Sequence, residues 1–386
     1  MWQTSRKDTK NHINKYLAGE LKDNSYLYLK LTIISLNDIF LCSLDPIKIV
    51  SLYKLNTMKI LRNTFLMLAL SLIVNSSAVS QSPGDGSGVI GRWNLTVVIE
   101  DEELEELGLF RHGLMDDDGF PGWLEVRRSG FSTLIGYYVG YEGSARPVSE
   151  VNYSAQEQKY HFTIPPQWMD IDDIHFEFTL EDDRLTGHKV LDGHTLQWTG
   201  VRAPDLTREE PPVWGSPKNL LDDNLSRWII PENNKFRMID GVLVNEEIGG
   251  NLVSKERFDD FKLSIEFRYP EGSNSGVYLR GRYEVQIEDN YGWDVNDLII
   301  GGIYGFIEPT VNAARPAGEW QTFEITLVGR HVTVVHNGIE VISNRPIPGI
   351  TGGSLDSNEG EPGPVMLQGD HGPVEFRKIV ITPAVN

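Results

Sequence analysis

Three successive runs between Phe261 and Glu288 alternate apolar and polar side chains with a period of two. Neighbouring side chains of a β-strand point to opposite faces, so each run predicts a strand with one apolar and one polar face. Short turn-forming linkers, Pro270–Asn274 and Arg280–Arg282, join the runs and favour antiparallel neighbours. We therefore expect one concave polar face that carries Glu266, Arg268, Tyr278, Arg280, Glu284 and Gln286.

This polar face has two simpler interpretations. Any single strand of this kind can be an ordinary strand with a solvated side. In addition, Arg268 and Arg280 can pair with Glu266 and Glu284 across strands, as oppositely charged neighbours on a sheet often do. Three such faces in succession fit the floor of a sugar-binding cleft better than three unrelated solvated strands.

The chain from 88 to 204 contains about eight short strand-like runs separated by Gly, Asp and Pro, which predicts a small all-β barrel or sandwich. Its start, Gly91-Arg92-Trp93, is similar to the Gly-x-Trp start of lipocalin-like barrels. The acidic run Glu100–Glu106 fits a solvated loop better than a short helix.

Residues 205–217 are rich in Pro and charge and predict a semi-rigid linker. The strand-like runs continue through 218–386, where Asp240–Gly241 has the composition of a hairpin turn. No repeat of fixed length and no long helical period is present, so both predicted domains are all-β.

The amino-terminal region differs from the rest. Met58 to Arg62 is basic, Phe65 to Val74 is apolar, and small residues follow up to Ser80, which is the layout of a secretory signal peptide over 58–80. Residues 1–57 then read as a mis-called start or a disordered extension. We expect a secreted or periplasmic protein, with no membrane attachment after signal cleavage.

Charge narrows the range of partners. The net charge is −20, and removal of residues 1–80 makes it about −25, because that segment holds 10 of the 35 Lys and Arg and 5 of the 55 Asp and Glu. Such a surface repels nucleic acid. The only cysteine, Cys42, precedes the signal peptide, so disulfides do not stabilise the predicted mature chain.

Several ordered motifs follow the first two of the three alternating runs between Phe261 and Glu288. They are YEVQI, IYG, RPAGEWQTFEI, VVHNGIEV and LQGDHGPVEFRKI. With the preceding EFR and GSNSGVYLR, they resemble the 3-keto-disaccharide hydrolase family over about Pro212 to Pro383. The resemblance implies a concanavalin A-like β-sandwich of the jelly-roll type, as in lectins and glucanases. It also implies a hydrolase whose carbohydrate substrate is oxidised at the 3-position.

The resemblance also selects candidate site residues. His371 falls on the family's LQ-D-H-G motif, which here contains an inserted Gly369; without the resemblance, a surface histidine in a turn would be the simpler interpretation. Removal of the proton at C2, next to the ketone at C3 of such a substrate, would give an enolate. We expect His371 and Glu284 to act as acid and base, and Arg280 to stabilise this enolate. The predicted substrate-binding residues are Glu266, Arg268, Tyr278, Gln286, Asn274, Tyr304 and Gln368. Trp293, in a polar loop, is a further candidate for stacking on a sugar.

The sequence predicts no metal site. Asp116-Asp117-Asp118-Gly119 lacks the ligand spacing of an EF-hand, although assistance by a divalent cation stays open. The chain has no Gly-x-Ser-x-Gly elbow, phosphate-binding loop or His-Glu-x-x-His motif. A non-catalytic carbohydrate-binding protein is the main alternative to an enzyme, and an adhesion or scaffold protein is another.

Overall fold

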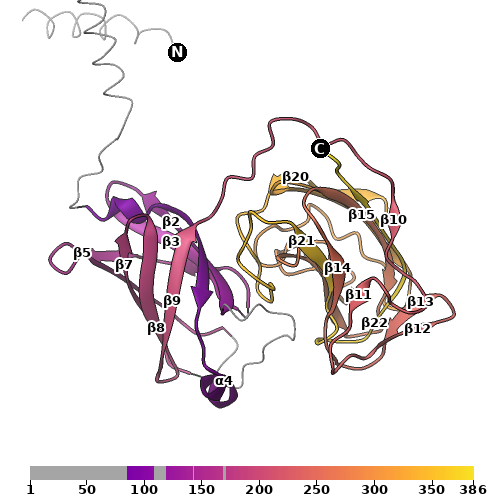
Figure 1. Cartoon of the computed structure of the whole chain (residues 1–386), viewed down its shortest axis with the longest axis horizontal. Helices are drawn as coiled ribbons and strands as arrows, with labels where there is room; N and C mark the ends of the chain where they lie inside the picture. The colour runs from indigo at the N-terminus through magenta and orange to yellow at the C-terminus, as the bar shows by residue number, and fades with distance from the viewer. Residues whose placement is uncertain (1–84, 108–118, 142, 168–170) are drawn as a thin grey trace, which may run out of the picture. The chain divides into compact units, whose positions relative to one another are not determined.

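The computed structural model describes residues 85–107, 119–141, 143–167 and 171–386 (Figure 1). Gln81–Asn386 form one compact unit. Within the described ranges, no helix is long and apolar enough to cross a membrane. The predicted signal peptide and Asp116–Asp118 lie outside the described residues. The expected division into two domains stays a prediction.

The first part of the chain forms one nine-stranded antiparallel sheet with the order β4-β3-β2-β1-β9-β8-β7-β6-β5. Each strand pairs with the next one along the chain, except that β4 and β5 do not pair with each other and form the two edges of the sheet. In addition, β1 pairs with β9. The strands are β1 (Gly91–Val97), β2 (Phe120–Ser129), β3 (Thr133–Val139), β4 (Arg146–Val148), β5 (Asn152–Ser154), β6 (Lys159–Ile164), β7 (Ile174–Glu181), β8 (Arg184–Leu191) and β9 (His194–Arg202).

Large aromatic side chains fill the interior of this sheet. Trp93, Tyr138, Phe162, Phe176 and Trp198 are all buried in one hydrophobic cluster. Phe162 and Phe176, on neighbouring strands, stack with ring centroids 4.3 Å apart. The period-two placement of these aromatics therefore explains the way in which a large number of short strands can bury a single core.

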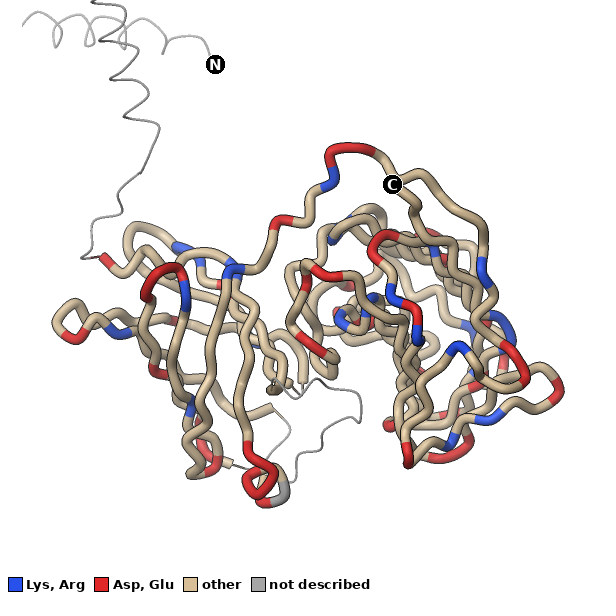
Figure 2. Tube along the Cα trace, viewed as in Figure 1, with Lys and Arg blue, Asp and Glu red and all other residues tan. Residues whose placement is uncertain are grey.

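Two short helical segments accompany the first sheet: η1 (Ser87–Val89) and α4 (Asp101–Leu107). The expectation of a loop over the acidic run is wrong. Its two leucines, Leu104 and Leu107, are buried, and they anchor a seven-residue helix in which Asp101, Glu102 and Glu106 are exposed. Figure 2 shows this helix as an almost continuous acidic segment.

The second part of the chain forms two further antiparallel sheets. The larger has the order β12-β13-β22-β15-β18-β19-β20, with β10 also paired to β22, and the smaller has the order β11-β14-β21-β16-β17. The strands are β10 (Lys218–Asn219), β11 (Trp228–Ile229), β12 (Phe236–Ile239), β13 (Val242–Asn245), β14 (Leu252–Phe258), β15 (Phe261–Arg268), β16 (Asn274–Leu279), β17 (Tyr283–Glu288), β18 (Gln321–Val328), β19 (His331–His336), β20 (Ile339–Pro346), β21 (Gly363–Leu367) and β22 (Val374–Pro383).

The apolar faces of these two sheets share one core. Leu263, Ile265 and Phe267 of the larger sheet and Val277 and Val285 of the smaller sheet all lie in the same buried cluster. Figure 1 shows β14 and β21 on one side of this part of the chain and β15 and β22 on the other. The expected all-β class with a two-sheet sandwich is confirmed.

The turns explain how the strands are divided between the sheets. Asp240 and Gly241 both have positive φ, 49° and 79°, and they close the β12–β13 hairpin as expected. The segment Pro270–Ser273 instead leads from β15 in one sheet to β16 in the other, so the expected hairpin at this position is wrong.

Candidate active site

A cavity of about 1250 Å³ lies on the polar face of the smaller sheet. Seven of the ten sequence-predicted residues line it: Asn274, Tyr278, Glu284, Gln286, Tyr304, Gln368 and His371. The opposite, apolar face of the same strands packs into the core of the sandwich. The alternation of side chains in β16 and β17 thus gives the cavity a rigid polar floor.

Tyr278 and Glu284 form the centre of this floor. They are directly paired neighbours on β16 and β17, and the Tyr278 hydroxyl lies 2.9 Å from Glu284 Oε2. The same hydroxyl lies 3.0 Å from the carbonyl oxygen of Gly352, and Gln368 Nε2 donates to it at 3.5 Å. Tyr278 can therefore donate its proton to the Gly352 carbonyl while it accepts one from a protonated Glu284.

Burial raises the pKa of the Glu284 carboxyl to about 8. The hydrogen bond from Tyr278 and the charge of His371 lower this pKa, whereas Asp370 and Glu288 raise it further. Desolvation dominates because the side chain is only 4% exposed and no cation is bonded to it. At neutral pH Glu284 is consequently a protonated acid in the wall of a polar cavity.

His371 and Asp370 form a second acid–base pair at the cavity. They lie in the loop between β21 and β22, where His371 Nδ1 is 2.7 Å from Asp370 Oδ1. Asn251 donates from Nδ2 to Asp370 Oδ2 at 3.2 Å, and its own Oδ1 accepts from the backbone N–H of Gly369 at 2.7 Å. This chain of contacts orients the imidazole at the cavity.

Other polar groups of the wall are suited to hydroxyl recognition. Gln368 is 6% exposed, and its Oε1 is buried without a hydrogen-bond partner. A buried unpaired amide oxygen costs free energy unless a ligand donates to it. Burial also raises the pKa of Tyr304 to about 12, so this hydroxyl stays protonated as a donor at neutral pH.

Two glycines make room for the Tyr278–Glu284 pair. A Cβ added to Gly276 would lie 2.2 Å from Glu284 Oε1, and one added to Gly353 would lie 2.5 Å from the Tyr278 hydroxyl. Gly353 also has a φ of 72°, which side-chain-bearing residues rarely adopt. Both positions therefore require glycine if the pair is to keep this geometry.

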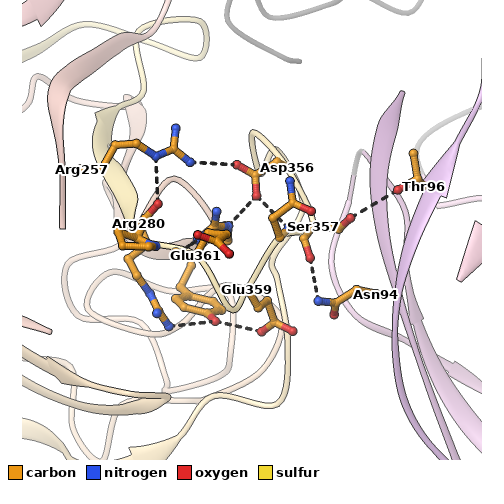
Figure 3. A network of polar contacts seen from close by, with 12 residues as sticks. Asn94, Thr96, Arg257, Arg280, Asp356, Ser357, Glu359 and Glu361 are labelled. Atoms are coloured by element: carbon orange, nitrogen blue, oxygen red, sulfur yellow. Dashed lines mark hydrogen bonds and ion pairs between the residues drawn. The ribbon is translucent and has the colours of Figure 1, made fainter. Parts of the chain in front are cut away.

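Arg280 is not in the cavity, and its expected place on the polar face is wrong. It has a φ of 54° in the tight turn after β16, so its side chain leaves the alternation of the strand. It is fully buried and donates to Asp259 Oδ1 at 3.0 Å and to the Gly329 carbonyl at 2.9 Å. Figure 3 shows it within a polar network that includes Asp356 and Glu359.

Glu266 and Arg268 are likewise outside the cavity. Both belong to β15, which lies in the larger sheet, so they cannot share a face with Tyr278 and Glu284. Arg377 binds Glu266 at 2.6 Å, and Arg268 binds Glu375 at the same distance. Arg268 therefore does form a cross-strand ion pair, but with Glu375 on β22 and not with Glu266 or Glu284.

The cavity wall contains residues that sequence reasoning missed. Glu288 continues the same-face series of Glu284 and Gln286, so the alternation could have included it. Tyr141 comes from the segment after β3, and its carbonyl accepts a hydrogen bond from the Gly353 N–H at 2.7 Å. Nothing in the sequence links Tyr141 to β16 and β17, which lie more than 130 residues further along the chain.

No metal centre is apparent in the part of the chain that the structure describes, where no three His, Cys, Asp or Glu side chains gather closely enough to hold an ion. Glu284, Glu288, Asp370 and His371 all line the cavity. The arrangement offers a proton donor, an oriented imidazole and several hydrogen-bonding groups around one space.

Comparison with known proteins gives one family for the second part of the chain. Residues 216–382 match the family model described as the 3-keto-alpha-glucoside-1,2-lyase-like domain, which confirms the family expected from the sequence motifs. No curated protein is significantly similar to the chain.

Solved structures are also similar to parts of the chain. A candidate glycosyl hydrolase from Parabacteroides distasonis ATCC 8503 is 28% identical over 46% of this chain and 93% of its own, with a TM-score of 0.38. A second one from the same organism is 25% identical over 43% and 98%, with a TM-score of 0.36. A sialidase from Trypanosoma rangeli is 12% identical over 69% and 59%, with a TM-score of 0.31.

Proposed function

We propose that the 3-keto-alpha-glucoside-1,2-lyase-like domain at residues 216–382 cleaves glycosides that carry a ketone at C3. The family match supports a hydrolase-like function on a carbohydrate. The proposal that the substrate is a 3-keto-glycoside rests on one observation: a buried, protonated Glu284 and an imidazole held by Asp370 line the same cavity. That pairing supplies the acid and the base that this chemistry needs.

The ketone makes the neighbouring C2–H acidic, so a base of near-neutral pKa can remove this proton. His371 is the proposed base, and its electron pair takes the C2 proton while the C2–H electrons move to the C3 oxygen as an enolate. The enolate then expels the glycosidic oxygen from C1, which leaves an enone with a C1=C2 double bond. Glu284 gives its proton to the departing oxygen.

Hydration completes the reaction. Water adds to C1 of the enone, the C2 carbon takes a proton from His371, and the deprotonated Glu284 accepts the proton that water loses. The products are the 3-keto sugar and the free aglycone, so the net change is hydrolysis and both side chains return to their starting protonation states. Tyr278, Tyr304 and Gln368 are the proposed partners for the sugar oxygens because they line the cavity around Glu284.

The test uses the purified protein with a 3-keto-glucoside and with the same glucoside unoxidised, in D₂O. The proposal predicts that only the keto compound is cleaved and that the released 3-keto sugar carries deuterium at C2, because the proton on the imidazole of His371 exchanges with D₂O before it is returned. Free 3-keto-glucose kept without enzyme measures the background exchange. Cleavage of the unoxidised glucoside without deuterium at C2 would instead indicate ordinary two-carboxylate hydrolysis, and binding without turnover would indicate a non-catalytic protein.

We also propose that the protein is exported, because 58–80 has the layout of a signal peptide. Sequencing the amino terminus of the protein from its natural source tests this proposal. A mature chain that starts at Gln81 would support it, and one that retains residues 1–57 would contradict it.

A further inference from the structure

A second hollow lies among three connecting segments: the one between β15 and β16, the one after β17 and the one before β18. It has a volume of about 660 Å³ and is lined by Pro270, Glu271, Gly272, Asp289, Tyr291, Trp293, Pro316, Ala317 and Gly318. None of these residues lines the main cavity. The proposed reaction therefore makes no use of this hollow.

Its aromatic residues are exposed. Trp293 is 61% and Tyr291 is 55% exposed, and Phe131 is the only other exposed aromatic residue in the part of the chain that the structure describes. An exposed tyrosine and an exposed tryptophan two positions apart in the sequence, both lining a hollow, are typical of a binding surface rather than of a folding core.

The loop that carries these aromatics is held firmly in place. Asn290 is fully buried and donates from Nδ2 to Glu288 Oε2 at 2.9 Å. Asn312 Nδ2 donates to the carbonyls of Asn290, at 2.8 Å, and of Trp293, at 3.2 Å. The two rings are thus displayed on a pre-organised backbone, which lowers the entropy lost when a ligand binds.

The other side chains of the hollow indicate which ligand fits. Asp289 and Glu271 are hydrogen-bond acceptors for hydroxyl groups, and the Asp289 carboxylate is fixed by the Gly272 N–H at 2.8 Å. The lining contains no Lys or Arg, and the whole chain has a net charge of −20, so anionic ligands are repelled. A sugar ring combines apolar C–H faces for the aromatics with hydroxyl donors for the carboxylates.

We propose that Tyr291, Trp293 and Asp289 form a second carbohydrate-binding site that takes a neutral glycan chain. The loop connects this site with the main cavity, because Glu288 and Leu298 line the cavity at the two ends of the loop while Asp289, Tyr291 and Trp293 face the hollow. This binding does not require the cleavage reaction.

The test is native affinity electrophoresis of the full chain in gels that contain a soluble β-glucan, xyloglucan, galactomannan or, as an anionic comparison, polygalacturonate. At least one neutral polymer should retard the protein. Trp293→Ala and Tyr291→Ala should each weaken binding about tenfold or more, since each removes a stacking surface. Phe131→Ala removes an exposed aromatic side chain elsewhere, and this variant should bind like wild type.

Glu284→Gln separates this site from the main cavity, because it should slow turnover of a 3-keto-glucoside by about 10²–10⁴-fold yet keep the retardation. Retardation that persists in both aromatic variants would overturn the inference. So would retardation by polygalacturonate alone, or the absence of retardation by every neutral polymer.

Discussion

Glu284→Gln should change how the stability of the protein depends on pH. The glutamine has the shape of the protonated acid and keeps a donor for Tyr278, but it cannot ionise. In the wild type the pKa of Glu284 is about 8 in the folded state, against an ordinary value of 4.5 in the unfolded state. The folded state therefore holds a proton that the unfolded state has lost between these two pH values.

Stability falls with rising pH wherever the folded state binds more protons than the unfolded state. At about 1.4 kcal/mol for each unit between 4.5 and 8, wild type should lose about 3 kcal/mol of unfolding free energy by pH 7 and about 5 kcal/mol above pH 8, relative to pH 4, through this group alone. Glu284→Gln lacks this loss, so it should match wild type near pH 4.5 and exceed it above pH 7.

Urea unfolding of both proteins at several pH values from 4.5 to 8.5 measures the effect. The difference between the two curves is the informative quantity, because other titrating groups contribute equally to both. His371→Ala serves as a control for coupling, since the charge of His371 lowers the pKa of Glu284. Parallel curves for wild type and Glu284→Gln would refute the protonated, desolvated carboxyl at neutral pH.

Two further pairs of variants test the placement of residues around the site. Arg280→Ala should lower the unfolding free energy by about 3 kcal/mol or more, because it leaves a cavity in place of a fully buried side chain and removes the hydrogen bond to the Gly329 carbonyl. Arg268→Ala, in a partly exposed ion pair, should cost less than about 1 kcal/mol in the same urea experiment. Gly353→Ala should lower turnover as well as stability, because its Cβ would displace the Tyr278 hydroxyl. Gly338 has a similar positive φ, 82° against 72°, but lies in open space, so Gly338→Ala should affect stability alone. Equal turnover in the two glycine variants would contradict the assigned role of Tyr278.

The sequence predicted the strands and their buried faces because alternation is a local property. Ile265, Val277 and Val285 lie in the core as the period of two requires, and Tyr278, Glu284 and Gln286 share the polar face opposite it. Local pattern could not show which sheet each strand joins.

Arg280 and Tyr141 illustrate what the sequence could not show. A positive φ in the turn redirects Arg280 out of the alternation, and no composition signal marks that residue as left-handed. Tyr141 reaches the cavity only through long-range packing. The raised pKa of Glu284 depends on burial, which also exists only in the folded chain.

His371 and Glu284 are the proposed base and acid in the cleavage of a 3-keto-glycoside. The most direct measurement is the initial rate of sugar release from a 3-keto-disaccharide by wild type, His371→Ala and Glu284→Gln, with Arg268→Ala as a matched variant outside the cavity. We predict that each of the first two variants is slower by about 10²–10⁴-fold, while Arg268→Ala keeps the wild-type rate. Near wild-type rates for both His371→Ala and Glu284→Gln would contradict the proposed site.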